Sequence, residues 1–141
     1  MAIAAALVLA APPRPAAGRA QGAFQVVVHR DNPVTSLSRG TAASLFLKKA
    51  TEWPGGQKVE PVDLREGAPV RDAFSEAVLR RSVASVRAYW TQSIFSGRAV
   101  PPPELEDDEA VVAFVARSPW AIGYVSAGAR LAGVKAVAVR D

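Results

Sequence analysis

Three short runs of apolar residues, each bounded by turn-forming residues, are the first pattern in the chain. They are FQVVVH at 24–29, AIGYV at 121–125 and GVKAVAV at 133–139. Runs of this length, rich in β-branched residues, predict β-strands. A fourth segment, VEPVDL at 59–64, alternates weakly and predicts another strand. Because Pro61 has no amide hydrogen to donate, we expect it on an edge strand or near the beginning of a strand.

The segments between these runs have the spacing of amphipathic helices. Ser36 or Ser38 can cap a helix that runs to about residue 48, and Ser82 can cap one that ends at Gly97. A helix over 69–80 begins with a proline, and one that opens at 106–109 begins with acidic residues, both of which suit a first turn. Strands interspersed with helices predict one α/β domain, with a mixed sheet of about four strands flanked by helices.

The N-terminal segment predicts an exported protein. Residues 1–11 are almost entirely apolar, and prolines and small residues follow up to about residue 22. This pattern is typical of a signal peptide, although no Lys or Arg precedes the apolar run. We therefore expect a cleaved signal peptide at 1–22, a domain at 23–141, a periplasmic or secreted location and no membrane span after cleavage. The alternative is an Ala/Pro-rich tail on a cytosolic protein.

Composition and charge exclude several classes of function. The chain has no cysteine and a single histidine, so thiolate metal sites, disulfides and His-rich metal clusters are excluded. Its net charge is +4, but two of the arginines, Arg14 and Arg19, lie in the expected signal peptide. The remaining charges are interleaved rather than gathered, so we expect no nucleic-acid partner. No phosphate-binding glycine loop and no nucleophile with an adjacent base is evident, so we expect no enzyme and no cofactor.

Several segments, taken in their order, resemble the phosphate ABC transporter substrate-binding proteins. The resemblance covers about residues 24–127. It implies a single lobe of a periplasmic-binding-protein-like fold. The segments that carry it are Asn32-Pro-Val-x-Ser-Leu-Ser-Arg, Leu45-Phe46-Leu47, Trp53-Pro-Gly-Gly, Val62-Asp63-Leu64-Arg65-Glu66-Gly67 followed by Arg71 and Phe74, and Ala121-Ile-Gly-Tyr-Val.

The resemblance further implies that the protein binds phosphate or another small oxyanion and interacts with an ABC permease. Backbone amides at a helix start, hydroxyls and an arginine are the donors that such an anion needs. The residues expected to supply them are Ser36, Ser38, Arg65, Gly67, Ala68 and Arg71. The turn at 67–70 lacks the Ser and Thr of the family's Ser-Gly-Thr turn, and its proline has no amide hydrogen. The family binds its ligand between two lobes, of which this chain has one.

Structural explanations compete with this reading for each candidate residue. The two arginines, Arg65 and Arg71, can form surface ion pairs with Glu66, Asp72 or Glu76. The serines can cap a helix, and the acidic run at 106–109 can be a solvated helix start rather than a cation site. We expect the three tryptophans, Trp53, Trp90 and Trp120, to lie in the core. For His29 we expect a hydrogen-bonded structural role. The alternative function is a ligand-free adaptor that contacts another envelope protein.

Overall fold

The computed structural model describes residues 23–141. The expected signal peptide at 1–22 lies outside the described residues. Among the residues that are described, no helix is long and apolar enough to cross a membrane. The elements follow in the order β1 (Phe24–His29), β2 (Ser36–Ser38), α2 (Arg39–Phe46), β3 (Glu60–Pro61), β4 (Asp63–Leu64), α3 (Pro69–Phe74), the π-helix η1 (Ser75–Leu79), α4 (Val83–Phe95), β5 (Glu104–Leu105), α5 (Asp108–Arg117), β6 (Ala121–Ser126) and β7 (Val134–Arg140).

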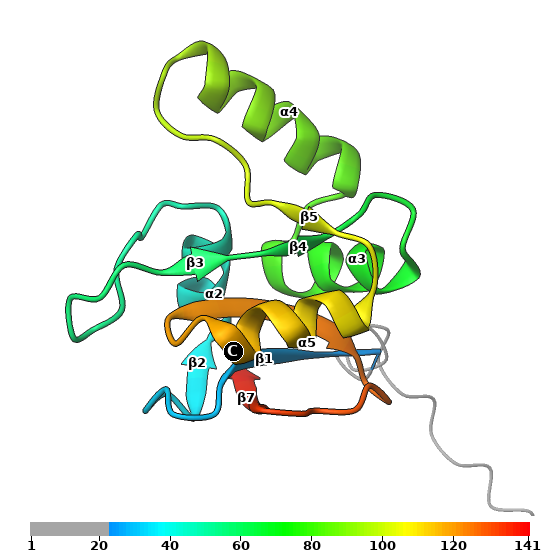
Figure 1. Ribbon diagram of the computed structural model, residues 1–141. Helices are drawn as coiled ribbons and strands as arrows, with labels where there is room; N and C mark the ends of the chain where they lie inside the picture. Colours follow the sequence, from blue (N-terminus) through cyan, green and yellow to red (C-terminus); the bar gives the residue numbers. More distant parts are fainter. Residues whose placement is uncertain (1–22) are drawn as a thin grey trace, which may run out of the picture.

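The main sheet has five strands in the order β2-β7-β1-β6-β3 (Figure 1). Strand β1 is antiparallel to both β6 and β7, whereas β2 is parallel to β7 and β3 is parallel to β6. The predicted mixed α/β fold is therefore confirmed, with one more strand in this sheet than expected. Strands β4 and β5 form a separate parallel pair. Pro61 lies in the edge strand β3, as its missing amide hydrogen predicted.

Strand β6 is the centre of the core because both of its faces are covered. On one face, a β-carbon at Gly123 would meet Val111 and Val115 of α5. On the other face, the ring of Tyr124 stacks on Phe74 at the end of α3, with the ring centroids 3.9 Å apart. Helix α5 thus covers one side of the sheet, and α2 and α3 cover the other (Figure 1). This explains the continuous apolar run at 121–125, since a strand buried on both faces does not alternate.

The expected single strand at 59–64 is wrong, because the structure divides it. Residues 60 and 61 pair with β6, and the amide of Val62 still donates to the carbonyl of Ile122 at 2.9 Å. The amide of Asp63 instead donates to the carbonyl of Pro103, also at 2.9 Å. The chain therefore leaves the main sheet after Val62 and pairs with β5, which lies far along the sequence and could not be found from local alternation.

Helix starts follow the sequence closely. The Ser38 side chain accepts a hydrogen bond from the amide of Thr41 and caps α2, whereas Ser36 lies in β2 and does not cap the helix. Ser82 caps α4 in the same way. The expected helix over 69–80 is present as α3 and the π-helix η1, and it ends at Arg80, which has a left-handed backbone.

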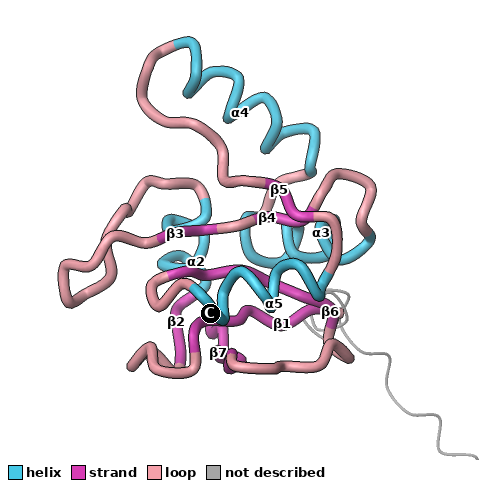
Figure 2. The backbone as a smooth tube through the Cα atoms, viewed as in Figure 1, coloured by secondary structure: helices cyan, strands magenta, loops and turns pink. Residues whose placement is uncertain are grey.

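Helix α4 projects from the body as an arm, and a long loop returns from it to β5 (Figure 2). Its first turns are anchored: Val86 and Trp90 are buried, and the Tyr89 hydroxyl donates to the carbonyl of Leu47 at 2.7 Å. The last turn is only partly covered, since Ser93 is buried but its neighbours are exposed. The helical spacing of Val86, Trp90 and Ile94 predicts that all three are buried, but Ile94 is 53% exposed, and its neighbour Phe95 is 87% exposed.

Two of the three tryptophans are in the core, as expected. Trp53 and Trp90 are buried, and Trp120 is half-buried. The indole nitrogen of Trp53 donates to the carbonyl of Trp120 at 3.0 Å and ties the loop before β3 to the start of β6. His29 accepts a hydrogen bond from the amide of Asp31 at 3.1 Å, so it is hydrogen-bonded, as expected.

Candidate functional site

The candidate site is centred on Arg71, whose side chain is only 6% exposed. Arg71 lies in the first turns of α3, three residues before Phe74, and therefore on the buried face of the helix. A pocket of about 370 Å³ opens beside it. Its lining comes from β4, the turn after β4, α3, α4, and the loop and strand that follow α4: Asp63, Glu66, Arg71, Arg87, Trp90, Pro101, Pro102 and Glu104.

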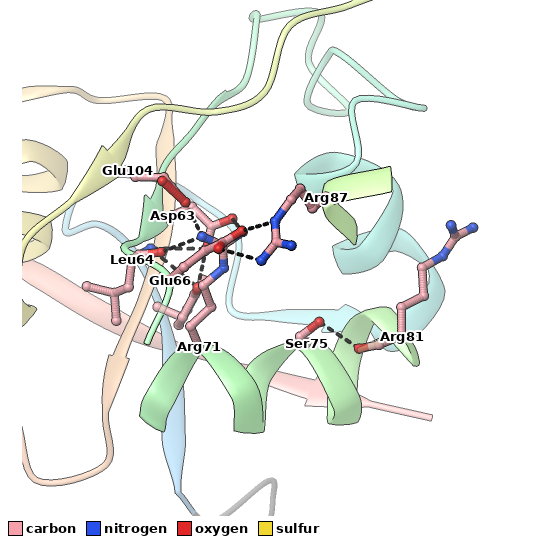
Figure 3. Close-up of polar contacts among 9 residues, drawn as sticks. Asp63, Leu64, Glu66, Arg71, Ser75, Arg81, Arg87 and Glu104 are labelled. Carbon is pink, nitrogen blue, oxygen red and sulfur yellow. Dashed lines mark hydrogen bonds and ion pairs between the residues drawn. The ribbon is translucent and has the colours of Figure 1, made fainter. Parts of the chain in front are cut away.

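The guanidinium of Arg71 is already occupied by groups of the protein (Figure 3). It donates to the carbonyl of Leu64 at 3.0 Å and forms a short hydrogen-bonded ion pair with Glu104. The Asp63 carboxylate lies 3.6 Å from its other terminal nitrogen. Burial alone would lower the pKa of Arg71, but Asp63 and Glu104 raise it on balance. The guanidinium therefore stays charged and ties α3 to both strands of the small sheet.

Asp63 is held by hydrogen bonds as well as by the arginine. It accepts a short hydrogen bond from the Tyr124 hydroxyl and a bond of 3.0 Å from the amide of Leu64. Burial raises the pKa of Asp63, while the charge of Arg71 and these two hydrogen bonds oppose the shift. Burial and the Asp63 carboxylate also raise the pKa of Tyr124, so the phenol keeps its proton and donates it.

A second arginine faces the same pocket from α4. Arg87 forms a two-pronged ion pair with Glu66, at 3.0 and 2.7 Å (Figure 3). With all groups ionised, the lining carries three carboxylates against two guanidiniums, a formal charge of −1. Both arginines are thus already paired with carboxylates, and an oxyanion has to compete with these for the guanidinium groups. This competition weakens any binding relative to an arginine that has no internal partner.

The structure gathers four of the six expected site residues at the start of α3. They are Arg65, Gly67, Ala68 and Arg71, and only Arg71 lines the pocket. Gly67 has a φ of 90°, a value that an L-residue rarely adopts, and it makes the turn into the helix. Ser36 and Ser38 lie on β2, which forms the edge of the main sheet opposite β3, and neither lines the pocket.

The expected partners of the arginines are wrong. Arg65 pairs with Glu106 at 3.1 Å, and Arg71 pairs with Asp63 and Glu104; neither pairs with Glu66, Asp72 or Glu76. The expectation of a surface ion pair is also wrong for Arg71, because its side chain and that of Asp63 are largely buried.

Two residues of the acidic run at 106–109 hold the start of α5. Asp107 caps the helix by accepting from the amide of Ala110 at 2.9 Å, and Asp108 accepts from the amide of Ser126 at 3.1 Å. Helix α5 itself begins at Asp108, two residues later than expected. Among the described residues, no group of three or more His, Cys, Asp or Glu side chains could hold a metal ion.

Sequence reasoning missed most of the residues around Arg71: Asp63, Arg87, Trp90, Glu104 and Tyr124. One signal was available. Arg71, Phe74, Ser75 and Val78 are all buried and recur at the helical spacing of one face, so a charged residue heads an otherwise buried stripe. The partners could not be found in this way, since Tyr124 and Glu104 are separated from Asp63 by many intervening residues.

No protein-family model and no curated protein matches the chain. The structure is nevertheless similar to solved substrate-binding proteins. A protein described as a phosphate ABC transporter substrate-binding protein from Clostridium perfringens, solved with bound phosphate, is 23% identical with a TM-score of 0.67. An ABC-type phosphate transport receptor from Vibrio cholerae is 21% identical with a TM-score of 0.66, and PstS from Borrelia burgdorferi is 11% identical with a TM-score of 0.65.

These similarities cover 83% of this chain in each case, but only 44%, 46% and 47% of the three solved proteins. The chain thus spans somewhat under half the length of the proteins that it resembles. At these identities the similarity concerns the fold. The resemblance found in the sequence is confirmed at that level: the chain has the fold of a single lobe of a phosphate ABC transporter substrate-binding protein.

Proposed function

We propose that this protein is an extracytoplasmic solute-binding lobe that takes a small oxyanion, such as phosphate, weakly in the pocket beside Arg71. The observation that carries the proposal is that two arginines, Arg71 and Arg87, face one pocket in a fold shared with phosphate transport proteins. In this role the protein catalyses no reaction. Its protein partner is of the ABC permease class, and it works in the periplasm or in the secreted fraction.

The arrangement supports weak rather than tight binding. Each guanidinium can present two parallel N–H groups to an oxyanion, which is the geometry that suits phosphate. Arg87 is the accessible one, with a side chain that is 61% exposed, and it can turn from Glu66 toward a ligand at small cost because exposed ion pairs are weak. Arg71 must give up Glu104, whose side chain is 45% exposed.

Titration of the protein with inorganic phosphate, followed through backbone amide shifts by NMR, tests this proposal. We expect shifts that grow with phosphate concentration and centre on residues 64–71 and 87–90. The variant Arg87→Gln should weaken binding several-fold, since it removes one of the two cations of the pocket. Arg117→Gln is the matched control, because Arg117 is an exposed arginine at the end of α5. Equal affinities of these two variants, or no shifts in the wild type, would contradict the proposal.

The second candidate function, an adaptor that contacts another envelope protein, is favoured by exposed apolar residues at and after the end of α4. Ile94, Phe95 and Val100 are exposed at 53%, 87% and 63%, and they lie at the tip of the arm and in the loop after it. Neighbouring exposed apolar residues, such as Ile94 and Phe95, favour a protein contact. A photo-crosslinking residue in place of Phe95 should then capture a single envelope protein, and the same residue in place of Arg117 should not. Capture of the same proteins from both positions would count against the adaptor.

A further inference from the structure

A second pocket, of about 270 Å³, lies where the loop after α2, the segment before β3 and the loop after α4 meet. It shares no lining residue with the pocket beside Arg71. Three of its lining residues are cationic: Lys48 from the loop after α2, Lys58 from the segment before β3 and Arg98 from the loop after α4. Three chain segments that are distant in sequence thus bring their positive charges to one place.

The charges of this second pocket are not neutralised within the described residues. No carboxylate lines it, and none of Lys48, Lys58 and Arg98 takes part in an ion pair within 23–141. Burial lowers the pKa of Lys48, and the positive charge of Lys58 lowers it further. This is the reverse of the site around Arg71, where each guanidinium has a carboxylate partner.

The backbone of Lys48 adds an independent observation. Lys48 follows the C-cap of α2 and has a φ of 55°, in the left-handed region. Glycine is the residue that suits this position at the end of a helix, because a β-carbon makes the conformation unfavourable. A lysine there tolerates backbone strain while it supplies a cation to the pocket, and strained residues of this kind gather at binding sites.

Apart from Thr51, the remaining lining of the pocket is apolar. Leu45 and Val59 are buried beneath it, and Val100 forms part of its rim with 63% of its surface exposed. A ligand that matches both features has an anionic group for the cations and a short apolar substituent for this wall. A fully hydrated inorganic anion would leave the apolar wall uncovered.

We infer that the pocket formed by Lys48, Lys58 and Arg98 is a second binding site, which takes a small anion that carries a short apolar substituent. The anionic group lies among the three cations, and the substituent lies against Leu45, Val59 and Val100. The site is separate from the oxyanion pocket of the proposed function and does not depend on it.

Isothermal titration with n-butyl phosphate, inorganic phosphate and n-butanol tests this inference. Butyl phosphate should bind about tenfold more tightly than inorganic phosphate at this site, an increase that burial of fewer than two methylene groups supplies. Butanol alone should not bind, because it lacks the charge. Pentanoate shows whether the anionic group must be a phosphate or can be a carboxylate. Binding of either butyl phosphate or pentanoate supports the site.

Variants locate the binding. Lys58→Gln and Lys48→Gly should each weaken butyl phosphate binding about fivefold, the loss expected for one partly exposed charge. Lys49→Gln, which removes an exposed lysine that does not line the pocket, is the control and should leave the affinity unchanged. Lys48→Gly should also melt no lower than the wild type, since glycine suits the left-handed backbone. Equal weakening by Lys49→Gln, or loss of binding in Arg87→Gln instead, would overturn the inference.

Discussion

Replacement of Arg71 by methionine tests whether this arginine holds the small sheet against the core. Methionine keeps most of the length of the side chain but removes the charge and all five N–H donors. The carbonyl of Leu64 then loses its partner at 3.0 Å, and the Asp63 side chain, only 13% exposed, loses its cation. Removal of one partner from a buried ion pair costs about 3–5 kcal/mol.

The lower end of that range applies here for a structural reason. Asp63 keeps its hydrogen bonds from Tyr124 and Leu64, and the distance of 3.6 Å to Arg71 is longer than a hydrogen bond. We therefore expect Arg71→Met to lower the free energy of unfolding by about 3 kcal/mol. With a urea m-value of about 2 kcal/mol/M, the unfolding midpoint should fall by about 1.5 M.

A double-mutant cycle with Asp63→Asn separates the ion pair from the packing of the arginine. Asparagine can still accept from Tyr124 and from the amide of Leu64 but carries no charge. In the Asp63→Asn background, Arg71→Met should cost about 1–2 kcal/mol less than in the wild type. Urea unfolding followed by the fluorescence of the buried Trp53 and Trp90 measures both values. A cost below about 1 kcal/mol in the wild type, or an identical cost in both backgrounds, would refute this account of the site.

Three further predictions concern the fold. Gly123→Ala should destabilise the protein by about 1–3 kcal/mol, because the added carbon would lie 2.8 Å from Val111; Gly128→Ala, which meets nothing within 4 Å, is its control in thermal melts. Gly40→Ala in α2 should raise stability by about 0.5 kcal/mol, since alanine is the better helix former and has open space there, and a lower melting temperature would contradict this. Asp107→Ala removes the cap of α5 and should cost about 1 kcal/mol by urea unfolding, whereas an unchanged midpoint would mean that the cap contributes nothing.

The sequence predicts the parts of the fold that local pattern determines. Strand β1 has the predicted bounds, β6 is one residue longer than predicted, and β7 is shifted by one residue at both ends. Each is a run of apolar residues between turn residues, so its pattern is visible without its partners. The short strands β2, β4 and β5 have two or three residues each, and only their pairing with distant segments defines them. A pattern of neighbouring residues contains no information on such pairing.

The same distinction explains the candidate site. The position of Arg71 at a helix start could be predicted, because Gly67 and Pro69 mark the turn. Its neutralisation by Asp63 and Glu104 could not, since these carboxylates meet it only through the parallel pairing of β4 with β5. The sequence predicts that Arg71 is available to phosphate. In the structure it is paired with carboxylates, so phosphate has to compete with them for the guanidinium.

The affinity of the variant Glu104→Gln for phosphate measures this competition between Glu104 and phosphate most directly. The substitution removes the carboxylate that occupies Arg71 and brings the formal charge of the pocket from −1 to zero. Isothermal titration should show that phosphate binds about tenfold more tightly than in the wild type. This is the change in affinity expected when phosphate no longer has to displace one partly exposed carboxylate from Arg71. Glu109→Gln, at an exposed position on α5, should bind as the wild type does. An affinity of Glu104→Gln equal to that of Glu109→Gln would contradict the claim that Glu104 competes with the ligand for Arg71.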